Sequence, residues 1–111
     1  MIKSGLGDQN QSTAKLIYNI VREIPEGKVM TYGKIATLVS LKLMEKVSPR
    51  YVGYVLHKNE DPEIIPCHRV VNARGKVAKS YKFGGWEAQR KKLLVEGIRF
   101  KDKEHVYNGF L

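Results

Sequence analysis

The sequence has only one cysteine, Cys67, among its 111 residues. A disulfide within the chain is therefore impossible, and a zinc site made of several cysteines is excluded. A lone cysteine is most often a buried, unreactive residue that packs like a small apolar side chain. Its neighbours in the sequence decide whether Cys67 has a chemical role.

Long apolar runs are also absent. No stretch approaches the ~20 residues that span a bilayer, and the first ten residues lack the charged and then apolar pattern of a signal peptide. We expect no membrane partner and a cytoplasmic location, associated with the nucleoid, or a nuclear location if the organism is eukaryotic. A chain of this length buries one hydrophobic core, so we expect a flexible N-terminal tail over 1–11 and a single domain over 12–111.

Acidic residues are few, because 11 Asp and Glu stand against 20 Lys and Arg, which gives a formal net charge of +9. A surface this positive attracts polyanions, and for a soluble domain the commonest polyanion is nucleic acid. An acidic membrane surface fits less well, since the basic residues are interleaved with apolar patterns rather than gathered on one long helix. The charge balance therefore favours a nucleic acid as partner.

The spacing of the apolar residues predicts several helices. Ser12 suits the N-cap of the first helix, which Pro25 ends. The second begins at Thr31, and the third follows Ser48 and Pro49, which suit the N-cap and the first position of a helix. Two short helices joined by a turn have the outline of a helix-turn-helix. The third helix carries its basic and aromatic side chains on the outer side: Arg50, Tyr51, Tyr54, His57 and Lys58.

The segment after the third helix has the pattern of a strand and a turn. Residues 68–72 are predicted to form a short strand, 72–75 a turn and 76–78 a return strand, so that the hairpin is a wing beside the helix pair. A last helix is predicted over 86–96, and the segment from Lys101 either packs back or remains loose. The predicted fold class is mainly α with a small β-hairpin, a winged helix-turn-helix-like DNA-binding domain.

The surroundings of the cysteine suggest chemistry. A thiol attacks as the thiolate, so a reactive cysteine needs a base or a positive field nearby. His68 follows Cys67 directly, but adjacent residues in an extended segment point to opposite faces, so contact needs a turn or a bridging water. A carboxylate that orients the histidine would complete a relay, and spacing alone leaves three candidates: Glu96, Glu87 and Asp61.

Residues 66–71, Pro-Cys-His-Arg-Val-Val, resemble the active-site signature of the O6-alkylguanine-DNA alkyltransferases, the methylated-DNA–protein-cysteine methyltransferases. Residues 31–36 and 50–53 are similar to the two helices of that family's helix-turn-helix. Asn59 stands where the family has its hinge asparagine, and 89–97 resemble its closing helix. The resemblance covers the family's C-terminal catalytic domain, without the N-terminal domain that many members carry.

The resemblance implies a role for each member of a catalytic set. Cys67 is expected to accept the alkyl group from guanine O6 by direct displacement. His68 is expected to take the thiol proton through a water, with Glu96 orienting the ring. Tyr32 is expected to stabilise the guanine leaving group, and Arg50 to fill the gap left by the flipped nucleotide. Flipping is required because O6 of a stacked, paired guanine is out of reach of a protein thiol.

The resemblance also implies a partner, double-stranded DNA that contains O6-alkylguanine. Contacts with this DNA are expected from Thr31, Tyr32, Arg50, Tyr51, Gly53, Tyr54, Lys58 and Arg69. The substrate pocket is expected to be lined by Tyr32, Asn59, Pro66, Val77 and Tyr81. The resemblance implies no cofactor and no metal, and a monomer that acts once. Trp86 is expected either to line the pocket mouth or to cap the core.

Three functions remain open on the sequence. The first is stoichiometric DNA repair by alkyl transfer to Cys67. The second is a non-catalytic, alkyltransferase-like lesion sensor that binds O6-alkylguanine and recruits excision repair; such proteins usually have Trp in place of the cysteine, whereas here Cys67 is present. The third is a winged-helix DNA-binding regulator whose cysteine is a redox sensor or inert.

Overall fold

The computed structural model describes residues 6–111, with side chains from residue 12 onward. Helix α1, Leu6–Arg22, starts inside the segment that the sequence predicts as a flexible tail, so Ser12 lies within the helix and is not its N-cap. Residues 1–5, the rest of that predicted tail, lie outside the described residues.

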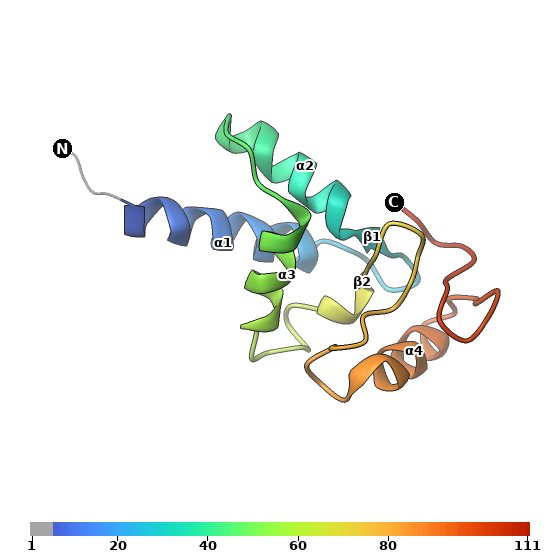
Figure 1. The fold of residues 1–111 in the computed structure, drawn as a ribbon. Helices are drawn as coiled ribbons and strands as arrows, with labels where there is room; N and C mark the ends of the chain where they lie inside the picture. Colours follow the sequence, from blue (N-terminus) through green and yellow to red (C-terminus); the bar gives the residue numbers. More distant parts are fainter. Residues whose placement is uncertain (1–5) are drawn as a thin grey trace.

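Helices α2, Tyr32–Leu43, and α3, Pro49–His57, form the expected helix-turn-helix (Figure 1). Thr31 caps α2 by accepting a hydrogen bond from the backbone N of Lys34 at 3.0 Å, and Ser48 caps α3 in the same way. The cap at Ser48 was expected from the sequence, and Thr31 stands where the second helix was expected to begin. The buried residues of the two helices belong to one apolar cluster, to which α1 also contributes: Ile35, Ala36, Val39, Val52, Val55 and Leu56.

The small sheet is parallel, and the predicted β-hairpin is wrong. Strand β1, Met30–Thr31, pairs with strand β2, Val70–Val71, in parallel. Residues 76–78 do not return along β2. Instead Lys76 forms an antiparallel bridge with His105. The C-terminal segment folds back and pairs with residues 75–77, where the predicted hairpin would have placed β2. The mainly α character of the prediction is confirmed.

The C-terminal segment packs back on the domain. The backbone N of Val29 donates to the carbonyl of Gly109 at 2.7 Å, and that of Val106 donates to the carbonyl of Gly75 at 2.9 Å. Gly75 has φ +83°, and a Cβ there would lie 2.7 Å from the ring of Phe110, so this turn requires glycine. The last residues therefore hold the turn after β2 against the strand that precedes α2.

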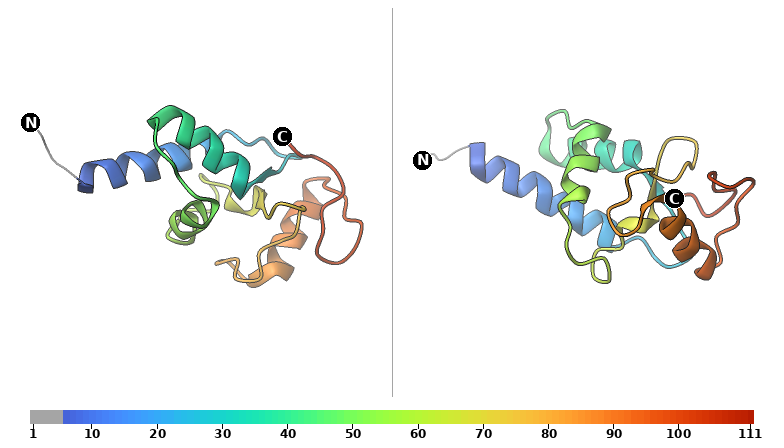
Figure 2. Two further views of the ribbon diagram at one scale, coloured as in Figure 1. Left: turned by 45° about the horizontal axis from the view of Figure 1, so that its top comes forward. Right: turned by 60° about the horizontal axis from the view of Figure 1, so that its bottom comes forward.

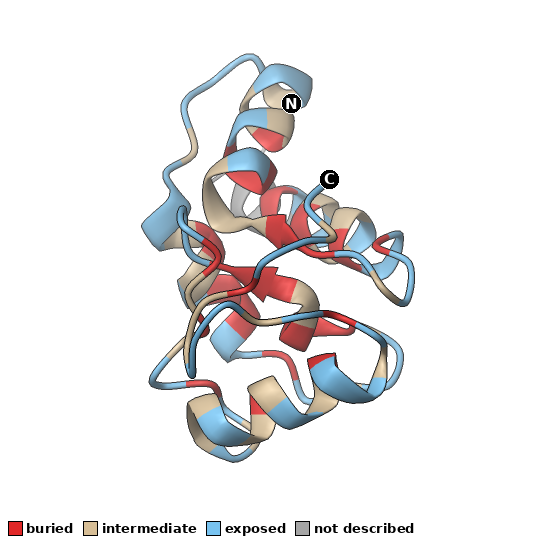
Figure 3. Ribbon diagram, turned by 90° about the vertical axis from the view of Figure 1, so that its right-hand side faces the viewer, coloured by how far each residue is buried: buried red, intermediate tan, exposed pale blue. Residues whose placement is uncertain are grey.

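Helix α4, Gly85–Val95, lies on the opposite side of the strands from helices α1–α3 (Figures 1 and 2). Two apolar clusters result. The first joins the three N-terminal helices, and the second lies between β2, α4 and the C-terminal segment. Buried residues concentrate on the strands between the two (Figure 3). A short 3₁₀ helix, Cys67–Arg69, leads into β2 and contacts α4, which places Cys67 where the two parts of the domain meet.

Candidate active site

Cys67 is the first residue of the 3₁₀ helix and is 7% exposed. The side-chain amide of Asn59 donates to its Sγ at 3.5 Å and to the carbonyl of Ile65 at 3.0 Å. The amide oxygen of Asn59 in turn accepts from the backbone N of Asp61 at 3.0 Å. Every polar atom of this buried asparagine is thus engaged, and its orientation toward the sulfur is fixed.

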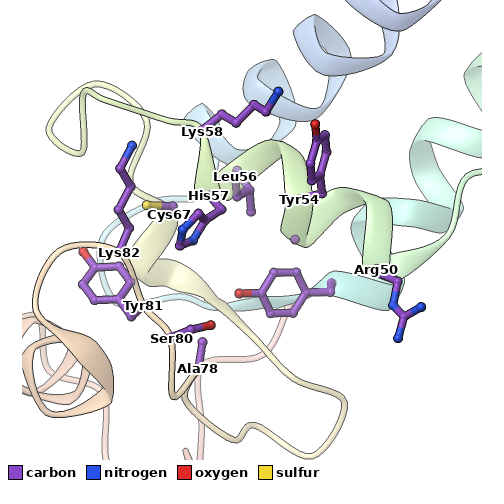
Figure 4. Close-up of a pocket in the computed structure, with 12 residues that line it drawn as sticks. Arg50, Tyr54, Leu56, His57, Lys58, Cys67, Ala78, Ser80, Tyr81 and Lys82 are labelled. Atoms are coloured by element: carbon purple, nitrogen blue, oxygen red, sulfur yellow. The ribbon is translucent and has the colours of Figure 1, made fainter.

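Cys67 opens onto a pocket of about 440 Å³ between α3 and the loop that precedes α4 (Figure 4). A cavity of this size suits a small-molecule group such as a base. The helix-turn-helix supplies one side of the pocket, including Tyr32, Arg50 and Gly53, and the loop supplies the other. The full lining is Tyr32, Arg50, Gly53, Tyr54, Leu56, His57, Lys58, Cys67, Ala78, Ser80, Tyr81 and Lys82.

Two of the predicted pocket residues lie elsewhere. Val77 is 1% exposed and belongs to the second apolar cluster, so its assignment to the pocket is wrong. Pro66 lines a second cavity, of about 630 Å³, that lies against His68, Arg69 and Glu96. Tyr32 and Tyr81 are in the lining, and Asn59 reaches the pocket through its bond to Cys67.

A partly buried ion-pair cluster holds the segment that follows Cys67. The Nε2 of His68 lies 2.9 Å from Glu96 Oε2, and two nitrogens of Arg69 donate to the same carboxylate at 2.7 and 3.0 Å. Glu96 is therefore the carboxylate that meets His68, which spacing alone left open. Its pKa is raised by burial, but the hydrogen bonds from Arg69 and His68 outweigh this and lower it overall.

Arg69 was predicted to contact DNA, and the structure gives it a different position. Besides its bonds to Glu96, its Nη1 donates to the carbonyl of Ile24, just after α1, at 2.7 Å. The guanidinium thus links the 3₁₀ helix to both α1 and α4, and its side chain is only 16% exposed. We therefore leave Arg69 out of the candidate DNA interface.

The protonation states suit a thiol beside a neutral base. Burial raises the pKa of the Cys67 thiol, against smaller opposite effects from Asn59 and from the charges of Lys92 and Lys82. Burial lowers the pKa of His68 more than Glu96 raises it. At neutral pH the histidine is uncharged, with its proton on Nε2 facing the carboxylate. Its buried Nδ1 has no partner among the described residues and is free to accept a proton.

Tyr32, the first residue of α2, is a hydroxyl donor at neutral pH. Burial, and then the neighbouring Cys67, raise its pKa to about 12. A Cβ at Gly53 would lie 3.7 Å from the Tyr32 ring, so the absence of a side chain there leaves space between α3 and the tyrosine. The two helices of the helix-turn-helix thus position this hydroxyl in the pocket.

The outer side of α3 and its C-cap carry most of the remaining residues that were predicted to contact DNA. Arg50 and Lys58 are exposed, and so is Tyr54, whose ring lies 4.6 Å from the Lys58 ammonium. Tyr51 packs partly against the first apolar cluster and lies 6.0 Å from the ring of Tyr54. Thr31 is half-buried and acts as the cap of α2.

Sequence reasoning missed three residues near the site. Gln89, fully buried on α4, donates to the carbonyls of His68 and Val70 at 3.0 and 2.9 Å. Lys82 and Lys92 lie close enough to Cys67 to affect its pKa. A polar residue at a core-facing position of the last helix was the available signal for Gln89, whereas the lysines resembled ordinary surface charge. Trp86 packs against the second apolar cluster and is not among the residues that line the pocket.

Within residues 6–111, no helix is long and apolar enough to cross a membrane. Among the same residues, no group of three or more His, Cys, Asp or Glu side chains is arranged to hold a metal ion.

Comparison with known proteins gives consistent matches. Residues 12–98 match the model of the "6-O-methylguanine DNA methyltransferase, DNA binding domain" family. The chain is 40% identical over 83 residues to alkyltransferase-like protein 1 of Schizosaccharomyces pombe, covering 74% of this chain and 72% of that protein. It is 38% identical over 96 residues to a methylated-DNA–protein-cysteine methyltransferase of Methanocaldococcus jannaschii, covering 85% of this chain and 50% of that one.

A solved structure is also similar. It is an alkyltransferase-like protein of S. pombe in complex with damaged DNA containing O6-carboxymethylguanine, with a TM-score of 0.70 and 33% identity, covering 83% of this chain and 82% of that one. Several curated relatives are longer than this chain, which spans only 30% of a bifunctional methyltransferase/endonuclease of Thermoplasma volcanium.

Proposed function

The chain belongs to the 6-O-methylguanine DNA methyltransferase family, and on this premise we propose that it repairs DNA by moving an alkyl group from guanine O6 to Cys67. The observation that carries the proposal is Cys67 itself, a buried thiol that opens onto a base-sized pocket and is followed by a histidine paired with a partly buried carboxylate. We assign the activity to a single domain over 12–111.

Proton transfer precedes attack in the proposed mechanism. Because its pKa is raised, Cys67 is mostly a thiol at neutral pH and needs a base. Nδ1 of His68 takes the proton through a water. Glu96, itself held by Arg69, keeps the imidazole in place, and the carboxylate stabilises the imidazolium that forms.

The thiolate then displaces guanine at the alkyl carbon. The S–C bond forms as the C–O6 bond breaks, and the electron pair of that bond leaves with the guanine. Tyr32, a hydroxyl with a pKa of about 12, donates a hydrogen bond to the departing base. The guanine is restored and takes up a proton, while Cys67 becomes a stable thioether. Each molecule therefore acts once, with no cofactor.

DNA reaches the site through α3. O6 of a stacked guanine is out of reach, so the damaged nucleotide must be flipped into the pocket. Arg50, Tyr54 and Lys58 lie on the exposed side of α3 that lines the pocket, where Arg50 fills the space left in the duplex and Lys58 contacts phosphate. The net charge of +9 supplies the attraction to the duplex. We place the protein where the DNA is, in the nucleoid-containing cytoplasm or in a nucleus, acting as a monomer.

An intact-mass measurement tests the transfer. The protein is incubated with a duplex that contains one O6-methylguanine, and its mass is compared with that of a Cys67→Ser variant. We expect a gain of one methylene, localised to Cys67, and no gain in the variant. An unmodified duplex serves as the second control.

A lesion sensor is the second candidate, because the chain is similar along most of its length to an alkyltransferase-like protein. It predicts tight, selective binding of the O6-methylguanine duplex with no change in mass, and that result would overturn the repair proposal. Equal binding of damaged and unmodified duplexes would instead favour a winged-helix regulator.

A further inference from the structure

Two lysines lie near the thiol end of the pocket: Lys82 is part of its lining, and Lys92 lies behind the lining residue Tyr81. Lys82 lines the pocket beside Cys67 and Tyr81 (Figure 4), and its Nζ donates to the carbonyl of Asn59 at 3.0 Å. Lys92, on α4, donates from Nζ to the hydroxyl oxygen of Tyr81 at 3.1 Å. Arg50 lies at the other end of the pocket (Figure 4), so the two lysines are distinct from the positive charge that faces the duplex.

Neither ammonium is neutralised within the described part of the chain. The carboxylates that form ion pairs there belong to Glu96, Asp102 and Glu104, and none pairs with Lys82 or Lys92. The residues that line the pocket include no Asp or Glu. Both lysines also lower the pKa of the Cys67 thiol against the effect of burial, so their positive field reaches the sulfur.

Tyr81 adds a hydrogen-bond donor at the same place. Its hydroxyl oxygen accepts from Lys92, and burial raises its pKa, so the hydroxyl remains protonated. No acceptor for that proton lies among the described residues. A group bound beside Cys67 therefore meets a free hydroxyl and the unpaired Lys82 ammonium, with the unpaired Lys92 ammonium bonded to that hydroxyl from behind.

We propose that this pocket selects O6-alkylguanines whose alkyl group carries a negative charge, with carboxymethyl as the smallest such group. The inference rests on the proposed base-flipping function. In a direct displacement the alkyl carbon lies against Sγ, so the rest of the alkyl group is confined to the neighbourhood of Lys82 and Tyr81. A carboxylate there gains charge-assisted hydrogen bonds that an alkyl chain cannot form.

The lysines also remove an obstacle to the reaction. A thiolate that approaches a carbon next to a carboxylate is repelled by the like charge. The unpaired ammonium groups of Lys82, in the pocket, and of Lys92, behind Tyr81, offset this repulsion. The products are S-carboxymethylcysteine at Cys67 and restored guanine, with the S–CH₂ bond formed and the CH₂–O6 bond broken, and no other reactant is needed.

The experiment uses two lesions of equal shape and different charge. Duplexes that contain O6-carboxymethylguanine or its neutral amide, O6-carbamoylmethylguanine, are compared for binding and for mass gain on the protein. We expect the charged lesion to bind about fivefold or more tightly than the amide, because a charge-assisted hydrogen bond at a partly solvated site has about this effect. Lys82→Gln and Lys92→Gln are expected to bring the ratio of the two affinities toward one.

Two further variants make the result specific. Lys82→Arg keeps the charge and should retain the preference. Lys91→Gln removes an exposed charge from the same helix as Lys92 that neither lines the pocket nor bonds to Tyr81, and should leave the ratio unchanged. If the lysines only activate the thiol, Lys82→Gln and Lys92→Gln will slow the reaction with both lesions equally. That outcome contradicts the proposal.

The readouts also separate this inference from the proposed function. A binding preference for the charged lesion without any mass gain would support the charge selection and refute the transfer. Transfer from O6-methylguanine together with equal affinities for the acid and the amide would support the repair function and refute the charge selection.

Discussion

Cys67 and His68 are neighbours in the chain, yet they line different cavities. Cys67 opens onto the pocket beside α3, and His68 lines the cavity on the side of Glu96. The 3₁₀ helix to which both residues belong thus presents them to different cavities. In the proposed mechanism the thiol therefore faces the flipped base, and its proton leaves toward His68, whose carboxylate partner Glu96 does not line the pocket.

Gln89 positions this segment, because its single amide connects three backbone groups. Besides the two carbonyls to which it donates, its Oε1 accepts from the backbone N of Ala78 at 2.8 Å. Gln89→Met keeps the volume and removes all three bonds. We expect the free energy of unfolding in urea to fall by about 2–4 kcal/mol, since buried backbone groups lose their partner, and the reaction of Cys67 with O6-methylguanine DNA to slow.

Lys91→Ala is the matched control, two residues along the same helix on its exposed side. Its unfolding free energy should stay within about 0.5 kcal/mol of the parent. A Gln89→Met protein with unchanged stability and unchanged alkyl transfer would show that the three hydrogen bonds do not position the active-site segment.

At the scale of elements, local signals predicted the helices and failed for the sheet. The caps Thr31 and Ser48 act within three residues of their partners, so their residue types alone predict where α2 and α3 begin. The parallel pairing of Met30–Thr31 with Val70–Val71 joins distant segments. A turn at 72–75 favoured a hairpin, but which strand pairs with which depends on tertiary packing that no local pattern contains.

The same distinction holds for the site. The thiol and its histidine follow from a short motif, and the resemblance implied Glu96. Arg69 was predicted at the DNA surface but bonds to the backbone just after α1, and Val77 was predicted in the pocket but packs in the second apolar cluster. These contacts arise only when distant segments pack together, so the sequence pattern could not indicate them.

The C-terminal segment contributes to the fold through Val106, which is 1% exposed, whereas the next residue, Tyr107, is 63% exposed. Val106→Ala should lower the free energy of unfolding by about 2 kcal/mol, because two methyl groups leave the second apolar cluster. Tyr107→Ala should change it by less than about 0.5 kcal/mol. Urea unfolding of both variants tests this, and equal effects would mean that the segment does not pack as described.

At the scale of the whole molecule, the domain is built from two apolar clusters that meet at the active site. One lies within the helix-turn-helix and α1, and the other joins α4 to the C-terminal segment. Three ionisable groups lie where these parts meet, and their pKa values are shifted: those of Cys67, His68 and Glu96. The stability of the whole domain is therefore coupled to their protonation.

This coupling predicts that the free energy of unfolding is roughly constant between about pH 6.5 and pH 9 and decreases on either side. The pKa of His68 lies below its ordinary 6.5 in the folded protein. As the pH falls below 6.5, the unfolded chain therefore binds a proton that the native protein does not, and stability decreases. The pKa of Glu96 is also lowered in the folded protein, so the loss of stability continues as the pH falls below its ordinary 4.5. The pKa of Cys67 is raised above its ordinary 9.0 in the folded protein. The unfolded chain therefore loses this proton first, and stability also decreases as the pH rises above 9.

Urea unfolding between pH 4 and pH 10 measures this profile, with Cys67→Ser and His68→Gln as probes. The serine variant should lose part of the decrease above pH 9, because its side chain does not titrate there. The His68→Gln variant should lose part of the decrease that begins below pH 6.5. An acid decrease in the parent protein that begins only below pH 4.5 would mean that His68 is not held neutral in the folded state, and the proposed base would then lack its proton-accepting nitrogen.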